Sequence, residues 1–230
     1  MGEMVGFSSN GDSAQGYLAL PASGTGPGVM VVQEWWGLVP QIKRVCDRLA
    51  DEGIVALAPD LFRGDVAEHT EMDKAAKLMS AMPMDRAARD MAGAVDYLRE
   101  HRAVTSAKIG VVGFCMGGML TLVIAVQQGD KIGAAVPFYG APLGDSAPDW
   151  SKLTAPVRGH FAEQDDFFPP AAIKDLERQL RDMGKNVVFD VHPASGHAFC
   201  NEENALGTYD ADLTTKCWTA TVGFLKDRLS

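Results

Sequence analysis

The sequence has little cysteine and no long apolar segment. Its four cysteines show neither C-x-x-C spacing nor the density of a secreted, disulfide-bonded domain. The longest apolar stretches, such as Leu120–Val126, fall far short of the roughly 20 residues that span a bilayer. Residues 1–10 contain no basic region followed by an apolar one, so no secretory signal is visible. We therefore expect a cytoplasmic protein with reduced thiols.

Positive charge is also scarce. There are 21 Lys and Arg against 30 Asp and Glu, a net charge of −9. A protein that binds nucleic acid neutralises phosphates with a basic surface, and an anionic membrane repels an acidic chain. We therefore expect neither nucleic acid nor a membrane as a partner. The 47% hydrophobic content excludes a disordered chain, and 24 glycines without a repeat exclude collagen.

What the sequence does contain is a regular alternation of short apolar runs and longer amphipathic segments. The apolar runs predict buried strands at 28–33, 54–58, 108–114, 133–138, 156–161 and 187–191. The amphipathic segments predict helices at 39–52, 84–101, 117–128, 169–183 and 209–229, with a weaker helical pattern over 66–83. This alternation indicates right-handed βαβ units around a parallel sheet. We predict one domain over residues 1–230, a three-layer α/β fold with a mostly parallel central sheet and helices on both faces.

The segment Lys108–Gly118 carries the strongest chemical signal. A predicted buried strand runs into Gly113-Phe-Cys115-Met-Gly117 and then directly into an apolar helix. This is the G-x-nucleophile-x-G pattern of a strand–turn–helix elbow, with cysteine as the nucleophile. The glycines avoid collisions at the sharp turn, and the N-terminus of the helix favours a thiolate. A buried cysteine is otherwise usually inert, but the strand–turn–helix context favours the catalytic interpretation.

A nucleophilic thiol needs a base, and the base needs a carboxylate that orients it. In hydrolases with this elbow, the nucleophile is followed in the chain by the acid and then by the histidine. Glu163, Asp165 and Asp166 follow the strand predicted at 156–161 and compete for the role of the acid. Taken singly, they are explained as a solvated turn before a helix. Their place in the order of catalytic groups favours a functional role.

Five histidines are candidates for the base. His69 and His101 lie on or near predicted helices, and we expect both to be solvated. His160 and His192 lie in or at the end of strands and are better explained as hydrogen-bonded structural residues. His197 follows Ser-Gly on a loop beyond a strand, which is the position that a mobile base needs. We therefore predict His197 as the base.

Several ordered segments resemble the dienelactone hydrolase (carboxymethylenebutenolidase-like) family of α/β hydrolases. They cover nearly the whole chain and are Gln33–Gly37, Ala58–Phe62, Gly113–Gly118, Gln164–Pro169 and Gly196–Phe199. The resemblance implies the α/β-hydrolase fold and a hydrolase that acts on carboxylic esters or lactones. It implies no cofactor, and no Cys/His cluster with ligand spacing is visible in the sequence, so we expect no metal.

The resemblance also implies roles for individual residues. Cys115 is then the nucleophile and His197 the base. Asp165 is the orienting acid, because the acid of the family directly follows the position of Gln164. Glu34 would accept a hydrogen bond from the Cys115 thiol and hold or take its proton. The alternative for Glu34 is an ion pair with an arginine at the edge of the sheet.

The same resemblance assigns the oxyanion hole and the substrate contacts. The backbone N–H groups of Trp35 and Met116 would hold the oxyanion. Trp36, Tyr139 and Asn201 are the predicted substrate-binding residues. The adjacent tryptophans are equally suited to packing in a core or a lid.

The sequence departs from the family's dienelactone specialists at two arginines that hold the substrate carboxylate. One of these positions is Asn201, and the other lies in the arginine-free segment 68–82, where Met72 aligns with it. Arg63 and Arg86 flank this segment and could compensate. The departure indicates an ester that is less charged or larger than dienelactone.

The expected reaction is acyl transfer through a thioester on Cys115, which favours good leaving groups such as enol lactones and activated esters. A thioesterase or a general small-ester hydrolase fits the same residues. A non-catalytic ligand sensor with a redox-sensitive thiol is the other class, but it has no need for Asp165 and His197. We expect a small-molecule ester or lactone as the partner, and a monomer or weak homo-oligomer.

Overall fold

The core of the protein is a twisted sheet of mostly parallel strands. The computed structural model describes residues 2–9 and 11–230, and within them the strands form one sheet of eight, ordered β1-β2-β4-β3-β5-β6-β7-β8. β2 runs antiparallel to β1 and β4, and β3 to β8 are parallel to one another. The strands are β1 (Glu3–Ser9), β2 (Asp12–Ala19), β3 (Gly28–Val32), β4 (Val55–Pro59), β5 (Ile109–Phe114), β6 (Ile132–Phe138), β7 (Val157–Gln164) and β8 (Val187–Gly196).

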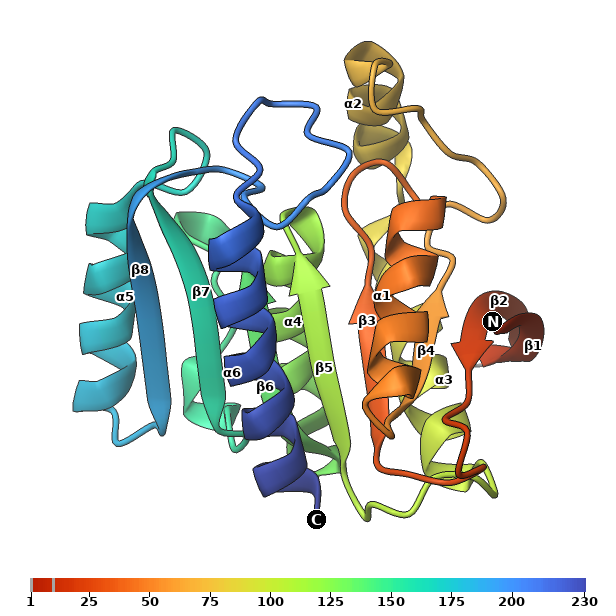
Figure 1. Ribbon diagram of the computed structural model, residues 1–230. Helices are drawn as coiled ribbons and strands as arrows, with labels where there is room; N and C mark the ends of the chain where they lie inside the picture. The colour runs from red at the N-terminus through yellow and green to blue at the C-terminus, as the bar shows by residue number, and fades with distance from the viewer. Residues whose placement is uncertain (1, 10) are drawn as a thin grey trace.

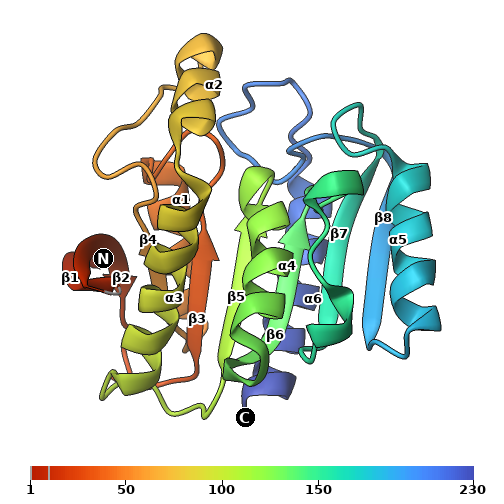
Figure 2. The same cartoon turned by 180° about the vertical axis from the view of Figure 1, so that it is seen from behind.

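Helices cover both faces of this sheet. α1 and α6 lie on the face seen in Figure 1, and α3, α4 and α5 lie on the face seen in Figure 2. The predicted three-layer α/β architecture is therefore confirmed. In the described part of the chain, no helix has both the length and the apolar character needed to cross a membrane. The helices are α1 (Pro40–Asp51), α2 (Met72–Ala81), α3 (Met84–Glu100), α4 (Met116–Gln128), α5 (Pro170–Asp182) and α6 (Ala211–Leu229).

Two hydrophobic cores form, one on each side of the sheet. All residues of β3, β4 and β5 are buried, because parallel strands between two helical layers have no solvated face. Successive side chains of β3 alternate between the layers: Val29 and Val31 pack toward α1 and α6, whereas Met30 and Val32 pack toward α3 and α4. The continuous apolar runs in the sequence are therefore strands buried on both faces.

The structure differs from the sequence-based prediction at the edges of the sheet. No strand is predicted before residue 28, yet β1 and β2 form an antiparallel hairpin there. Both strands are partly exposed and mix polar residues with glycine, so they lack the apolar run that marks the inner strands. The helical pattern over 66–83 becomes a helix only from Met72 onward, and β8 continues to Gly196, beyond the predicted end at 191.

The order of the strands places a crevice beside β3. From β3 the chain passes outward to β4, and it then returns to the other side of β3 to form β5. The connections at the carboxyl ends of these strands lead in opposite directions, which opens a crevice where α/β proteins bind ligands. α2 and the loop before α6 rise above this end of the sheet (Figure 1). The segments after β3, β5, β7 and β8 all meet there.

Candidate active site

Cys115 occupies a strained turn between β5 and α4. Its φ of 54° and ψ of −117° lie in a region that residues with a side chain rarely adopt. A side chain at Gly113 would collide with the carbonyl of Gly117, and a side chain at Gly117 would collide with the carbonyls of Val32 and Gln33. The two glycines therefore let α4 start beside the end of β3, directly after the cysteine.

The half-buried thiol of Cys115 is subject to opposing electrostatic influences. Burial raises the pKa of the Cys115 thiol, and the nearby charge of Glu34 raises it further, whereas the backbone N–H of Met116 lowers it. The pKa lies well above the ordinary value because burial and the carboxylate prevail. The helix N-terminus therefore acts in the expected direction, but burial and Glu34 outweigh its effect on the pKa of the thiol.

His197 is held by a carboxylate at the edge of the crevice. Its Nδ1 lies 2.8 Å from Oδ2 of Asp165, and both residues are buried. The other carboxylate oxygen of Asp165 accepts hydrogen bonds from the backbone N–H groups of Phe167 and Phe168, at 2.9 and 3.0 Å. The rings of the same two phenylalanines pack against the imidazole. The loop after β7 thus fixes both the acid and the histidine.

The three carboxylates that compete for this position are now distinguished. Asp166 is exposed, and Glu163 is exposed and accepts a hydrogen bond from the backbone N–H of Ala194. Asp165 is the one of the three that contacts His197.

Glu34 is a buried carboxylate two residues beyond the end of β3. It accepts hydrogen bonds from the Tyr139 hydroxyl, at 3.1 Å, and from Nδ2 of Asn201, at 2.6 Å. Burial raises the pKa of Glu34, although the charge of His197 and the two hydrogen bonds oppose this. Over the described residues no arginine or lysine forms an ion pair with it, so the alternative of an arginine partner is excluded there. The predicted hydrogen bond from the Cys115 thiol stays a prediction.

These side chains surround one cavity of about 340 Å³. Glu34, Cys115, His197 and Asn201 line it, and Asp165 lies behind the histidine. Trp35, Trp36 and Met116 also line it, which puts the backbone positions of the predicted oxyanion hole at the cavity wall. The rest of the wall is largely apolar and includes Met79, Met119, Phe167, Phe168, Ala205 and Leu206.

Tyr139, predicted to bind substrate, has a different place. It is fully buried, and its hydroxyl group contacts Glu34 rather than the cavity. Its backbone has a φ of 36°, at the turn that follows β6. Tyr139 is therefore positioned to hold Glu34, and the structure gives it no surface for a substrate.

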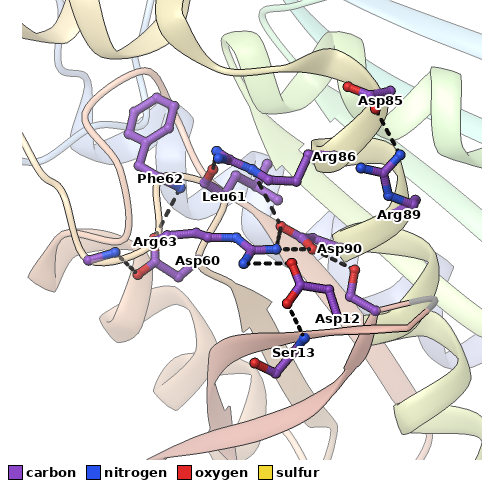
Figure 3. Close-up of polar contacts among 12 residues, drawn as sticks. Asp12, Ser13, Asp60, Leu61, Phe62, Arg63, Asp85, Arg86, Arg89 and Asp90 are labelled. Atoms are coloured by element: carbon purple, nitrogen blue, oxygen red, sulfur yellow. Dashed lines mark hydrogen bonds and ion pairs between the residues drawn. The ribbon is translucent and has the colours of Figure 1, made fainter.

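The two arginines considered as substitutes for the family's carboxylate-binding residues are used elsewhere. Figure 3 shows Arg63 and Arg86 pointing at Asp90 on α3. Arg63 donates to both carboxylate oxygens of Asp90, at 3.1 and 3.3 Å, and to Asp12. Arg86 donates to the carbonyl of Leu61. Neither arginine lines the cavity, so the suggested compensation is not found.

Met72, which aligns with the second arginine, begins α2 and is 41% exposed. It does not line the cavity either. Within the residues that the structure describes, no lysine or arginine contributes to the cavity wall. Among the described residues, a carboxylate on the substrate would therefore find no lysine or arginine partner in this cavity.

Two histidine predictions need correction. His69, expected to be solvated, is half-buried against the ring of Trp36, with centroids 4.9 Å apart, and burial lowers the pKa of this imidazole. His101 is also half-buried, and its Nδ1 accepts a hydrogen bond from the backbone of Ala103. The helical periodicity near both residues gives no sign of these aromatic and turn contacts.

The sequence also gives no sign of one other cluster. His160, His192 and Cys217 come from β7, β8 and α6 and converge in the interior, away from the cavity. The three side chains form a Cys/His cluster in space, and the expectation of no metal stays a prediction. Interacting members of the group lie 25 and 32 residues apart, which matches no local metal-binding motif, because the fold alone brings them together.

With this geometry in hand, comparisons with known proteins identify the family. The sequence pattern of the dienelactone hydrolase family matches residues 14–229. The chain is 39% identical to Protein usf of Aquifex pyrophilus and 36% identical to a provisionally named carboxymethylenebutenolidase of Aquifex aeolicus, covering 100% of both sequences in each pair. A crystal structure provisionally described as a dienelactone hydrolase, from Klebsiella pneumoniae, superposes with a TM-score of 0.82 at 27% identity and covers 98% of each chain.

The fold and the family together define an α/β hydrolase. The chain belongs to the dienelactone hydrolase family and is a hydrolase that acts on ester bonds.

Proposed function

We propose that the protein hydrolyses uncharged, largely apolar carboxylic esters or lactones, with Cys115 as the nucleophile, His197 as the base and Asp165 as the group that orients the base. The observation that carries this proposal is the 2.8 Å contact between His197 and Asp165 beside a cavity that Cys115 also lines. A carboxylate that accepts the Nδ1 proton leaves Nε2 of the histidine free to act as a base. An inert thiol would need no such pair.

Acylation begins from the protonated thiol. His197 removes the proton as the sulfur bonds to the carbonyl carbon, because a thiolate beside Glu34 is unfavourable until its charge passes to the substrate. The backbone N–H groups of Met116 and Trp35 stabilise the oxyanion that forms. When the C–O bond breaks, the leaving oxygen takes the proton from His197, and an acyl thioester remains on Cys115.

Deacylation uses the same groups with water as the nucleophile. His197 removes a proton from the water as its oxygen attacks the thioester carbonyl, and the same backbone N–H groups hold the second oxyanion. The C–S bond then breaks, the sulfur takes the proton back, and the carboxylic acid leaves. Tyr139 and Asn201 keep Glu34 in place throughout, so we assign both a positioning role.

The chemistry of the cavity wall supports an uncharged substrate. Burying a carboxylate against methionine and phenylalanine side chains without a cationic partner is costly. Asn201 stands where the family's dienelactone specialists have an arginine, and it donates to Glu34. A thioester with an apolar acyl group meets the same requirements as an oxygen ester, so thioesterase activity is the second candidate.

A redox-sensing role for Cys115 is less well supported. Peroxides react with thiolates, and the raised pKa of Cys115 keeps its thiol protonated at rest.

The test compares p-nitrophenyl acetate, p-nitrophenyl butyrate and cis-dienelactone as substrates. We expect hydrolysis of both nitrophenyl esters and a much lower kcat/KM for the anionic dienelactone. Cys115→Ala should abolish the activity, and Cys46→Ala, which alters a buried cysteine on α1, should retain it. Dienelactone turnover that matches or exceeds ester turnover would contradict the proposed substrate class, and an active Cys115→Ala would contradict the mechanism.

A further inference from the structure

A second group of chemically reactive side chains lies between the sheet and α6. His160 on β7, His192 on β8 and Cys217 on α6 each offer one ligand atom, and these atoms all lie within 4.8 Å of one another. The three residues are 1%, 8% and 1% exposed. None of them lines the cavity that holds Cys115, so the proposed ester chemistry does not use them.

The spacing of the three atoms is that of a metal coordination shell. Nδ1 of His160 lies 3.2 Å from Nε2 of His192, which in turn lies 3.3 Å from Sγ of Cys217. With metal–nitrogen and metal–sulfur bonds of about 2.1 and 2.3 Å, neighbouring ligand atoms in a tetrahedral zinc site are about 3.4 to 3.6 Å apart. The two contacts of His192 are therefore within a few tenths of an ångström of this spacing, and the third pair, His160 and Cys217, lies within 4.8 Å and would close by up to about 1 Å on binding one ion.

The backbone explains why the three side chains point to the same place. His160 pairs with Asp190 and Ala162 pairs with His192 across the parallel strands, so the two histidines lie on the same face of the sheet at diagonal positions. α6 packs on this face and directs Cys217 toward the histidines. Three rigid elements, rather than a loop, thus fix the arrangement.

The surroundings of His160 fit a metal ligand. Its Nε2 lies 3.3 Å from the hydroxyl oxygen of Thr221, one helical turn after Cys217. A histidine that binds a metal through one nitrogen usually donates its other N–H to a polar partner, and Thr221 is such a partner if Nδ1 is the ligand. Asp190 adds a carboxylate 3.8 Å from this Nδ1, itself held by Arg158 at 3.0 Å.

The site also has a route to solvent. A surface hollow of about 330 Å³ between β8 and α6 is lined by His160, His192 and Cys217, with Lys216 and Pro193 among the other residues at its wall. An ion can therefore reach the three ligands without unfolding the chain, and a water molecule from the hollow can complete a tetrahedral shell.

We propose that His160, His192 and Cys217 form a binding site for a zinc ion that joins β7, β8 and α6. On binding, the Cys217 thiol transfers its proton to solvent and the sulfur donates an electron pair to Zn²⁺, while the two imidazoles bind in their neutral form. The ion thus connects α6 to the two strands at one edge of the sheet, β7 and β8. The site is separate from the ester-hydrolysing cavity.

The experiment measures metal binding by the full chain after removal of metals with a chelator. Equimolar Co²⁺, a spectroscopic substitute for zinc, should give intense tetrahedral absorption and a sulfur-to-cobalt charge-transfer band, and Zn²⁺ should displace it with one ion per chain. Zn²⁺ at 100 times its Kd should also raise the Tm by about 5 °C or more. Cys217→Ser should lose the charge-transfer band, and Cys115→Ser should keep it.

Three outcomes would overturn the proposal. They are an octahedral spectrum without a sulfur band, a band that disappears in Cys115→Ser instead, and a band unchanged in Cys217→Ser. A measurement on the unmodified chain covers the case in which Cys217→Ser does not fold. Peptide-resolved alkylation should then show that Zn²⁺ slows labelling of Cys217 and leaves Cys46 unaffected, and equal labelling of Cys217 with and without Zn²⁺ would mean that the cluster is a hydrogen-bond network only.

Discussion

Asp165 shows how a single residue is selected for a role by the backbone around it. Two consecutive N–H groups from Phe167 and Phe168 occupy one of its carboxylate oxygens, which turns the other toward His197. Asp166, one position further on, is exposed and makes no such contact. Two adjacent aspartates therefore differ in function, because only Asp165 is placed to orient His197.

This difference gives the first prediction. Asp165→Asn should lower kcat for p-nitrophenyl acetate by about 10² to 10⁴-fold, because an amide cannot stabilise the imidazolium or hold the required tautomer. Asp166→Asn is the matched control and should change kcat less than about twofold, as expected for a surface site. Steady-state kinetics of the two variants provide the check, and equal effects would remove Asp165 from the mechanism.

The second residue-scale prediction concerns stability and pH. Burial raises the pKa of Glu34 above its ordinary value near 4.5, so the folded protein holds this proton more tightly than the unfolded chain does. The contribution of Glu34 to the free energy of unfolding therefore falls as the pH rises above about 4.5. Glu34→Gln has no proton to lose and avoids this decline.

Urea unfolding of the wild type and of Glu34→Gln should be compared at pH 4.5 and pH 7. The difference in unfolding free energy, Glu34→Gln minus wild type, should be larger at pH 7 than at pH 4.5. Glu100→Gln, at an exposed carboxylate that ends α3, is the control. A difference between Glu34→Gln and the wild type that is independent of pH would mean that Glu34 is not held in an environment that disfavours its charge.

At the scale of elements, the third prediction compares two helical glycines, Gly117 on α4 and Gly223 on α6, by the space that each leaves for a side chain. A side chain at Gly117 meets the backbone of the strand end beside it, whereas one at Gly223 on α6 meets nothing within 4 Å. Gly117→Ala should lower the free energy of unfolding by about 1–3 kcal/mol and reduce activity by shifting the elbow. Gly223→Ala should raise it by about 0.5–1 kcal/mol.

Denaturant unfolding and ester hydrolysis measured on both variants check this pair. A Gly117→Ala variant with wild-type stability and activity would show that α4 does not need its close approach to β3.

The elements also show how far the sequence predicts this structure. The inner strands are predicted from their continuous apolar runs, because a strand buried on both faces needs apolar residues at every position. The helices are predicted from the period of their apolar residues. Cys115 and His197 are predicted from their order beyond strand ends, whereas that order leaves Glu163, Asp165 and Asp166 open and the family resemblance selects Asp165. The hairpin of β1 and β2 could not be predicted in this way, because it is a partly exposed edge of the sheet. The cluster of His160, His192 and Cys217 could not either, because only long-range packing brings these residues together.

At the scale of the whole molecule, one buried carboxylate links the antiparallel edge to the helical layer. Asp90 on α3 is fully buried and accepts a hydrogen bond from the Ser9 hydroxyl at the end of β1. It also accepts hydrogen bonds from Arg63 in the segment after β4, as Figure 3 shows. Arg86 approaches the same carboxylate at 4.0 Å. The network joins β1 and the segment after β4 to α3, and none of its residues lines the cavity.

The fourth prediction follows from this division. Arg63→Ala should lower the free energy of unfolding by about 1–3 kcal/mol, less than a fully buried pair would lose because Ser9 and Arg86 remain near Asp90. The KM for both uncharged and anionic esters should stay unchanged. Urea unfolding and kinetics on the same preparation measure both effects, and a rise in KM confined to anionic substrates would instead assign Arg63 to substrate binding.

The central claim is that a thioester forms on Cys115. The most direct test is rapid acid quenching of the wild type during turnover of p-nitrophenyl acetate, followed by peptide mass spectrometry. We predict an acetyl group on the peptide that contains Cys115, located on the sulfur, and a larger acetylated fraction in Asp165→Asn if deacylation is slowed more than acylation. Rapid turnover with no acetyl group on Cys115, combined with full activity of Cys115→Ala, would contradict the account.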